Sequence, residues 1–260
     1  MSAKKERLDL LLHHRGYAPS RAKAQGIILS GRVFVNDKKV DKPGTRIDPA
    51  SQIEVRGPAT KYVSRGGDKL EAALEAFGID LRDKTALDVG ASAGGFTDCM
   101  LRHGARKVYA IDVGYGQLAW PLRTDPRVVV IERTNIRYAE PDLIPEKVDF
   151  AAVDVSFISL KLVLEPVRAM MAADGAIVAL IKPQFEAGRE QVGKGGVVRD
   201  PDVHREVVGS IVEFAASIGL RHGGTIESPL IGPAGNREFL AYFLKSDAKR
   251  DNAVAKGHNA

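Results

Sequence analysis

The sequence predicts an α/β protein in which an open, mostly parallel sheet carries helices on both faces, preceded by a small basic α+β domain. Three observations support this fold class. From about residue 65 to 246, short apolar runs that suit strands alternate with segments that suit helices, a pattern typical of a parallel sheet wrapped by helices. The first sixty residues instead contain two helical segments followed by a small hairpin sheet. Residues 1–69 also hold 15 Lys and Arg against 7 Asp and Glu, a local charge of +8 in a chain whose net charge is +5.

Length and composition limit the possible classes of protein. A chain of 260 residues can hold one large and one small domain, and we expect them at 1–60 and 61–246, followed by a polar, disordered tail at 247–260. The single cysteine, Cys99, excludes an internal disulfide and fits a reducing compartment. No apolar run approaches the roughly 20 residues that span a bilayer, and the charged N-terminus does not suit a signal peptide. We therefore expect a cytoplasmic protein that does not enter a membrane.

The first domain is expected to begin with two short helices. The first covers "RLDLLLHHRG" and stops at Gly16. Ser20 is a plausible N-cap for the second, which ends at Gly31. A strand at 32–37 then turns at Asn36-Asp37, and another strand follows at 52–57.

A cluster of basic residues surrounds the second of these helices: Arg15, Arg21, Lys23 and Arg32. Such a cluster can follow the phosphates of a nucleic acid, although charge alone is equally consistent with a solvated surface. The stretch "SRAKAQGIILSGRVFVND" resembles the alpha-L RNA-binding fold, also called the S-four-type domain, which occurs in a small-subunit ribosomal protein, pseudouridine synthases and tyrosyl-tRNA synthetases. The resemblance implies that this domain binds RNA.

The large domain is read as a series of strands and helices in chain order. They are a strand at 85–90, a helix at 95–105, strands at 107–114, 128–135, 148–157 and 176–185, a helix at 201–218, and strands at 223–230 and 237–246. Ligands of such sheets bind at the carboxyl ends of the strands. The functional motifs are therefore expected just after "LDVG", "AIDVG", "VDVSF" and "LIKPQ".

The stretch "LDVGASAGGFTD", residues 87–98, predicts a ligand site at the first of these strand ends. Its glycines let the backbone approach a ligand closely, and the helix that follows offers free amide groups. Asp112 ends the next strand, where an acid can accept hydrogen bonds from a ribose diol. A nicotinamide dinucleotide site has the same acid. The spacing G-x-x-x-G-G and the acid Asp88, which suits the ammonium group of the cofactor, favour S-adenosylmethionine. The predicted cofactor-binding residues are Asp88, Gly90, Ala91, Ser92, Gly94, Gly95, Phe96, Thr97, Asp112, Arg133, Asn135 and Asp154.

Several motifs together resemble the TlyA family. They are "SRGGDKL", "LDVGASAGGFTD", "AIDVGYGQL", "ERTNIR", "DVSFISL", "KPQFEAGREQVGKGGVVRD" and "SPLIGPAGNREF". The resemblance implies a Rossmann-like, FtsJ-like S-adenosylmethionine-dependent methyltransferase domain after the RNA-binding domain, with cytidine 2′-hydroxyls of ribosomal RNA as substrate and ribosomal subunits as partners. It also implies a Lys–Asp–Lys–Glu catalytic tetrad, which falls on Lys69, Asp154, Lys182 and Glu238.

The chemistry of ribose methylation supports two of these residues independently. A ribose hydroxyl is a weak acid, so a base must lie within hydrogen-bonding reach. A lysine serves only when its amine is partly neutral, which burial or a neighbouring cation favours. Lys182 follows the apolar run "AIVALI", where a charge has no packing purpose, and Asp154 follows "FAAVD". Without the resemblance, Lys69 and Glu238 would read as surface residues.

Other motifs leave alternatives open. The stretch "DVSF" lacks the prolines typical of enzymes that methylate base amino groups; Phe157 is expected in the core, with stacking on a base as the alternative. The loop 188–200 either contacts RNA phosphates or is simply mobile. Neither the histidines nor Cys99 show metal-ligand spacing, so no metal is expected. The predicted RNA-binding residues are Arg15, Arg21, Lys23, Arg32, Arg65, Arg189 and Lys194.

Three competing functions are weighed against RNA methylation. A membrane-lytic protein is suggested by the older haemolysin label of the family, but no strong amphipathic membrane helix supports it. A non-catalytic assembly factor that binds RNA would have no need of two charged residues at strand ends. A nicotinamide oxidoreductase is distinguished by cofactor titration. The sequence names neither the target nucleotide nor the ribosomal subunit, and it leaves the oligomeric state open.

Overall fold

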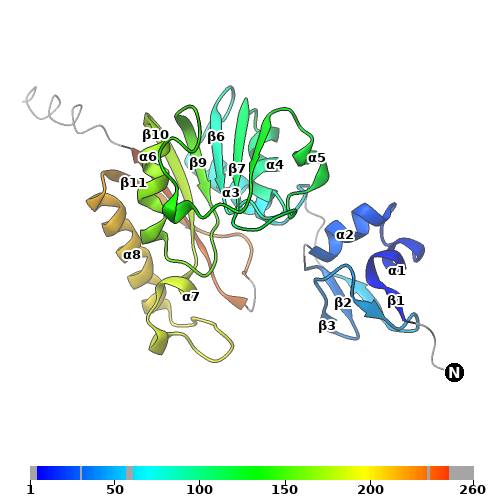
Figure 1. Cartoon of the computed structure of the whole chain (residues 1–260). Helices are drawn as coiled ribbons and strands as arrows, with labels where there is room; N and C mark the ends of the chain where they lie inside the picture. The colour runs from blue at the N-terminus through cyan, green and yellow to red at the C-terminus, as the bar shows by residue number, and fades with distance from the viewer. Residues whose placement is uncertain (1–4, 30, 57–60, 233–234, 246–260) are drawn as a thin grey trace, which may run out of the picture. The chain divides into compact units, whose positions relative to one another are not determined.

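The computed structural model describes residues 5–29, 31–56, 61–232 and 235–245. The chain forms two compact units, Met1–Arg65 and Gly66–Ala260 (Figure 1). The tail predicted at 247–260 lies outside the described residues. Within the described ranges, no helix has both the length and the apolar character needed to cross a bilayer.

The first unit packs two helices on small antiparallel sheets. Its elements are β1 (Glu6–Arg7), α1 (Leu8–His14), α2 (Arg21–Leu29), β2 (Val33–Val35), β3 (Lys38–Lys39), β4 (Arg46–Ile47) and β5 (Ile53–Val55). β2 pairs with β3 and β5, and β1 pairs with β4. The turn predicted at Asn36-Asp37 is confirmed: both residues have positive φ, 48° and 62°, as a tight hairpin between β2 and β3 requires. Leu8, Leu12 and Ile28 are fully buried between the helices and the sheet.

One carboxylate lies at the centre of this unit. Asp9 is fully buried, and its oxygens accept hydrogen bonds from Arg7 (3.0 Å), Arg21 (2.9 Å) and Gln25 (2.8 Å). Burial by itself raises the pKa of a carboxyl group, but the hydrogen bonds from Arg7, Gln25 and Arg21 outweigh it and hold the pKa of Asp9 well below its usual range. Asp9 therefore stays charged and ties α1 to α2.

The second unit is an α/β sheet with flanking helices. Its elements are α3 (Gly66–Phe77), β6 (Thr85–Val89), α4 (Gly95–Arg102), β7 (Lys107–Ile111), α5 (Trp120–Arg123), β8 (Val128–Ile131), η1 (Ile136–Tyr138), β9 (Val148–Val153), η2 (Leu160–Leu162), α6 (Leu164–Met170), β10 (Met171–Ile181), α7 (Pro183–Glu186), η3 (Arg189–Gln191), α8 (Pro201–Ser217), β11 (Leu220–Glu227) and β12 (Phe239–Lys245).

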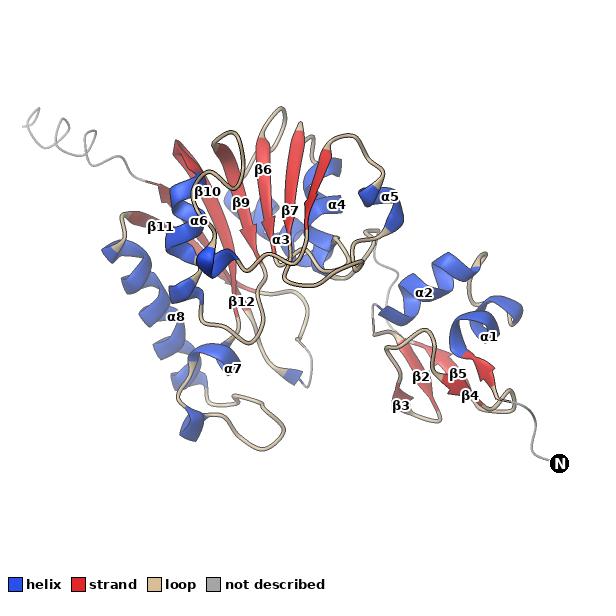
Figure 2. Ribbon diagram, viewed as in Figure 1, coloured by secondary structure: helices blue, strands red, loops and turns tan. Residues whose placement is uncertain are grey.

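The seven strands follow the order β11-β12-β10-β9-β6-β7-β8. All neighbours pair in parallel except β12, which runs antiparallel to both β10 and β11. The predicted open, mostly parallel sheet is confirmed. Figure 2 shows α3 and α4 on one face of the sheet and α6 and α8 on the other, where the largest core cluster lies.

The structure also departs from the sequence-based elements. The motif "SRGGDKL" opens a full helix, α3, which the strand and helix pattern did not define. β10 begins at Met171, five residues before the predicted strand, because an irregularity between Met171 and Ala176 lets it rejoin β9. β11 ends at Glu227 rather than at residue 230.

Candidate active site

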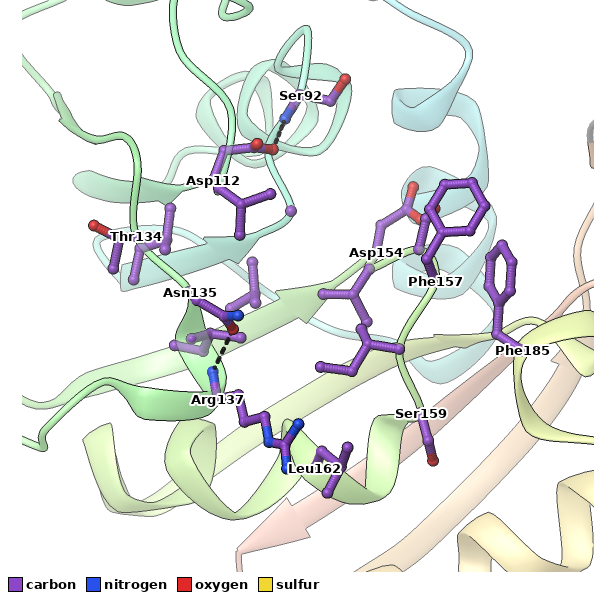
Figure 3. Close-up of a pocket in the computed structure, with 18 of the residues that line it drawn as sticks. Ser92, Asp112, Thr134, Asn135, Arg137, Asp154, Phe157, Ser159, Leu162 and Phe185 are labelled. Atoms are coloured by element: carbon purple, nitrogen blue, oxygen red, sulfur yellow. Dashed lines mark hydrogen bonds between the residues drawn. The ribbon is translucent and has the colours of Figure 1, made fainter.

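A cleft of about 1190 Å³ opens at the carboxyl edge of the sheet (Figure 3). Four consecutive strand ends contribute to its lining: Gly90 and Ser92 after β6, Asp112 after β7, Asn135 after β8, and Asp154 after β9. Parallel strands bring these ends together although they are far apart in sequence. The structure thus brings five of the predicted cofactor-binding residues together in one cavity.

The glycine turn after β6 is possible because Gly90 has no side chain. Its φ is 86°, and a Cβ at this position would overlap the backbone carbonyl oxygen of Asp154. The N–H of Asp154 in turn donates to the carbonyl oxygen of Val89 (2.9 Å). Gly90 therefore permits the close approach of the β6 and β9 ends that forms the floor of the cleft.

Asp112 is held firmly at the cleft. One carboxylate oxygen accepts from the N–H of Ser92 (2.8 Å), drawn in Figure 3, and the other accepts from the N–H of Gly114 (2.6 Å). Each oxygen keeps a further lone pair for a ligand hydroxyl. This arrangement suits an acid that receives a ribose diol.

Asp88 lies behind the turn and not in the cleft. It is fully buried, one oxygen accepts from the hydroxyl of Thr97 (2.6 Å), and the other has no hydrogen-bond partner among the described residues. Burial raises the pKa of Asp88 to about 7. Phe96 and Thr97 are likewise buried in α4. Asp88 therefore does not line the cleft in this structure, and its predicted contact with the cofactor stays a prediction.

The segment after β8 contributes unevenly. Thr134, Asn135 and Arg137 line the cleft, and the Asn135 side chain accepts from the N–H of Arg137 (3.1 Å; Figure 3). Arg133 is not part of the lining; its guanidinium lies 4.3 Å from the centre of the Tyr115 ring. Of these two predicted cofactor-binding residues, Arg133 and Asn135, only Asn135 lines the cavity.

The four residues of the expected tetrad form two ion pairs. Lys182 Nζ lies 2.5 Å from Asp154 Oδ1 and donates to Ser156 Oγ (2.8 Å). Lys69 Nζ lies 2.5 Å from Glu238 Oε2. The side chains are 10% (Lys182), 24% (Asp154), 12% (Lys69) and 0% (Glu238) exposed, so both pairs are withdrawn from solvent.

Strand register brings the two pairs to the same edge. Ile181 pairs with Phe239 across β10 and β12, so Lys182 and Glu238 are the next residues beyond that pair on neighbouring strands. α3, which carries Lys69, packs against β11 and β12. The four residues, which come from separate segments, therefore lie at the edge of the sheet where β9 and β10 end and β12 begins.

Phe157 differs from its expected core position. It is 90% exposed, has a positive φ of 63°, and lines the cleft. Its ring lies 4.9 Å from that of Phe185, and Figure 3 shows the two rings next to each other. A large aromatic residue held in this strained conformation and open to solvent favours the base-stacking alternative over the core.

The predicted RNA-binding residues fall into two groups. Arg21 bonds to Asp9, Arg15 to the carbonyl oxygens of Ser51 and Pro49, and Arg32 to that of Arg56, so these three also hold the first unit together. Of the others, Lys23 and Lys194 are exposed, Arg65 is half-buried, and Arg189 lines the cleft.

Sequence reasoning missed some members of the site. Ser156 contacts Lys182, and Phe185 pairs with Phe157; both lie within motifs already noted, "DVSF" and "KPQF", directly after strand ends. Position after a strand end was the available signal, but the partner of each side chain depends on contacts across the sheet. Among the residues that the structure describes, no group of three or more His, Cys, Asp or Glu is arranged to hold a metal ion.

Comparison with protein families matches both units. The model for FtsJ-like methyltransferases matches residues 62–245. The S4 domain model matches residues 6–53.

Individual proteins are similar over nearly the full chain. The "Putative rRNA methyltransferase YqxC" of Bacillus subtilis is 51% identical over 94% of this chain and 87% of that protein. The "16S/23S rRNA (cytidine-2'-O)-methyltransferase TlyA" of Mycobacterium tuberculosis is 45% identical over 98% of this chain and 95% of that protein. A solved structure named "Putative hemolysin from Streptococcus thermophilus" has a TM-score of 0.74 and 43% identity, covering 98% of this chain and 96% of that one.

Proposed function

The chain belongs to the FtsJ-like methyltransferase family, with an S4 domain ahead of the methyltransferase domain, and from this premise we propose that it methylates the ribose 2′-hydroxyl of cytidine in ribosomal RNA, using S-adenosylmethionine. The observation that carries the proposal is the pair formed by the buried Lys182 and the partly exposed Asp154, 2.5 Å apart, at the edge of the cleft. The relative from Mycobacterium tuberculosis is named for this reaction on 16S and 23S rRNA.

The cleft suits a nucleoside cofactor. Its volume of about 1190 Å³ is ample for a ligand of this size. We assign the ribose to Asp112, whose carboxylate is already aimed by two backbone amides. Val113 and Ile136 offer apolar walls for the adenine, with Asn135 at its edge. Asp88 supports the glycine turn from behind through Thr97.

The chemistry requires removal of one proton. S-adenosylmethionine supplies a methyl group on a positively charged sulfur. As the ribose oxygen gains the methyl group and the carbon–sulfur bond breaks, the hydroxyl proton must leave. We assign it to Lys182 Nζ. Asp154 and Ser156 orient that amine, and Asp154 is 24% exposed, which gives a proton a route to water. Lys69 and Glu238 fix the neighbouring strand end.

RNA recognition is assigned to two surfaces. The basic S4 domain binds the RNA through its phosphates. Phe157, exposed beside Phe185 at the cleft, offers a ring on which the target base can stack once it leaves its helix. A cytoplasmic location, where ribosomes are found, is part of the same proposal.

The experiment is to map 2′-O-methylation on both ribosomal subunits from cells with and without the protein, and then to restore it in vitro with pure protein and cofactor. New methylcytidine should appear at defined positions. Lys182→Ala should bind the cofactor and leave the positions unmethylated. The proposal fails if folded protein that binds the cofactor adds no methyl group to RNA, or adds it to a base instead of a ribose.

A further inference from the structure

The loop between η3 and α8 is tied to the start of β12 by one buried side chain. Asn236 is 2% exposed. Its Nδ2 group donates to the carbonyl oxygen of Gly196 (2.9 Å), and its Oδ1 accepts from the N–H of Val198 (3.1 Å). Because one amide atom meets a C=O and the other an N–H, its neighbours fix the orientation of the side chain.

The loop is built around this contact. Gly195 and Gly196 have φ of 81° and 74°, and the N–H of Gly193 donates to the carbonyl oxygen of Val197 (3.1 Å). This tight turn leaves Lys194 exposed and carries Val197 and Val198 back into the protein, where they are 7% and 2% exposed. The segment thus resembles a buried anchor with an exposed basic tip, and differs from a freely mobile loop.

A second buried side chain, that of His204 in α8, also contacts Val198. His204 Nε2 lies 3.0 Å from the carbonyl oxygen of Val198, and because a carbonyl only accepts, Nε2 carries the proton. The His204 ring is 4% exposed and lies 5.6 Å from the Phe239 ring in β12. Both backbone polar groups of Val198 are therefore satisfied by buried side chains.

Asn236 also contacts the turn that lies beside Glu238, one of the proposed catalytic residues. Its carbonyl oxygen accepts from the N–H of Gly232 (2.8 Å), and a Cβ on Gly232 would overlap the Glu238 carboxylate. Glu238 follows Asn236 by two residues and is paired with Lys69. One residue therefore joins the loop, the turn beside Glu238 and the start of β12.

We propose that Asn236 is a positioning residue, which fixes the loop 193–199 against the edge of the sheet and so holds Glu238 in its working geometry. The effect on catalysis rests on the proposed function; the contact with the loop does not. Asn236 does not line the cofactor cleft, so its role is indirect.

The contact is tested by hydrogen exchange on the full chain, measured in peptides that cover 193–199. Asn236→Ala leaves the Val198 N–H and the Gly196 carbonyl without partners, so exchange should be at least about tenfold faster. Asn236→Asp keeps an acceptor for Val198 and loses the donor to Gly196, so it should be intermediate. Ser217→Ala, on the exposed end of α8, is the control and should match wild type. Wild-type exchange in folded Asn236→Ala would overturn the proposal.

Turnover separates positioning from general loss of stability. At a temperature where both variants are folded, kcat at saturating RNA should fall at least about tenfold in Asn236→Ala and less in Asn236→Asp, with cofactor affinity within about threefold of wild type. A loosened loop with unchanged kcat would show that Glu238 does not depend on it. If the wild-type protein methylates no RNA, the proposed function fails, while the exchange data still decide whether Asn236 holds the loop.

Discussion

Each unit buries carboxylates beside cations, but the cations differ. In the first unit, the buried Asp9 is paired with Arg7 and Arg21, whose side chains are about half exposed. In the second unit, Asp154 and Glu238 are paired with Lys182 and Lys69, whose side chains are only 10% and 12% exposed.

The difference separates structural from chemical use of charge. An arginine keeps its proton at any physiological pH and forms several hydrogen bonds at once, so it suits a permanent link between α1 and α2. A lysine has a compact amine that, unlike a guanidinium, can take part in proton transfer. Asp88 is a third case, since it accepts a hydrogen bond from the hydroxyl of Thr97 and not from a cation, and burial raises its pKa to about 7.

The sharpest test of the comparison is to replace the lysine beside Asp154 with an arginine. Lys182→Arg preserves the positive charge beside Asp154 but cannot deprotonate, so single-turnover methylation should fall by about 10²–10⁴-fold. Cofactor and RNA binding should stay near wild type. If the variant keeps more than about a tenth of the rate, Lys182 acts through its charge alone, and the hydroxyl proton leaves by another route.

The buried acid without a cation should make stability depend on pH. Between about pH 4 and 7 the folded protein holds a proton on Asp88 that the unfolded chain has lost, since the pKa rises from 3.8 to about 7 on folding. This contribution is full below about pH 4 and is lost as the pH rises through 7. Asp88→Asn should remove this pH dependence of the free energy of unfolding. The difference in unfolding free energy between the variant and wild type should shift in favour of the variant by roughly 2–4 kcal/mol from pH 4 to pH 8. Urea unfolding of both proteins at both pH values measures this shift. If the variant and wild type differ in unfolding free energy by the same amount at both pH values, the raised pKa of Asp88 is contradicted.

Removing the acid of the arginine cluster should destabilise the first unit. Asp9→Ala leaves Gln25 and the N–H of Leu10 without their acceptor, at a cost of about 3 kcal/mol. Hydrogen exchange should accelerate in 5–56 and remain unchanged in the sheet of the second unit. Uniform acceleration across both units would show that the first unit is not an independent cooperative element.

The mildest change exchanges the cation within that cluster. Arg21→Lys keeps the charge beside Asp9, and Arg7 and Gln25 remain. The free energy of unfolding should change by less than about 1 kcal/mol. A loss as large as that of Asp9→Ala would mean that the fork-shaped guanidinium, and not charge, joins the helices.

The sequence was sufficient for features that depend on local pattern. Alternating apolar runs located the strands, and strand ends located Asp112, Asp154 and Lys182. It could not place Phe157, because only the positive φ imposed by the loop turns that ring outward. It could not separate Asp88 from the cleft, because alternation along β6 decides which face a side chain takes. Lys69 and Glu238 came only from the family resemblance, since their pairing joins residues 169 positions apart.

The antiparallel β12 has a consequence for how the protein is made. It lies between β10 and β11, although it is the last strand among the residues that the structure describes. Until β12 inserts, β10 and β11 each lack the neighbouring strand that pairs with them, and Glu238 cannot pair with Lys69. During synthesis the S4 domain, built from local contacts, can fold early, whereas the second unit must wait for its final strand. The nascent chain therefore acquires the ability to hold RNA before it acquires the ability to modify it.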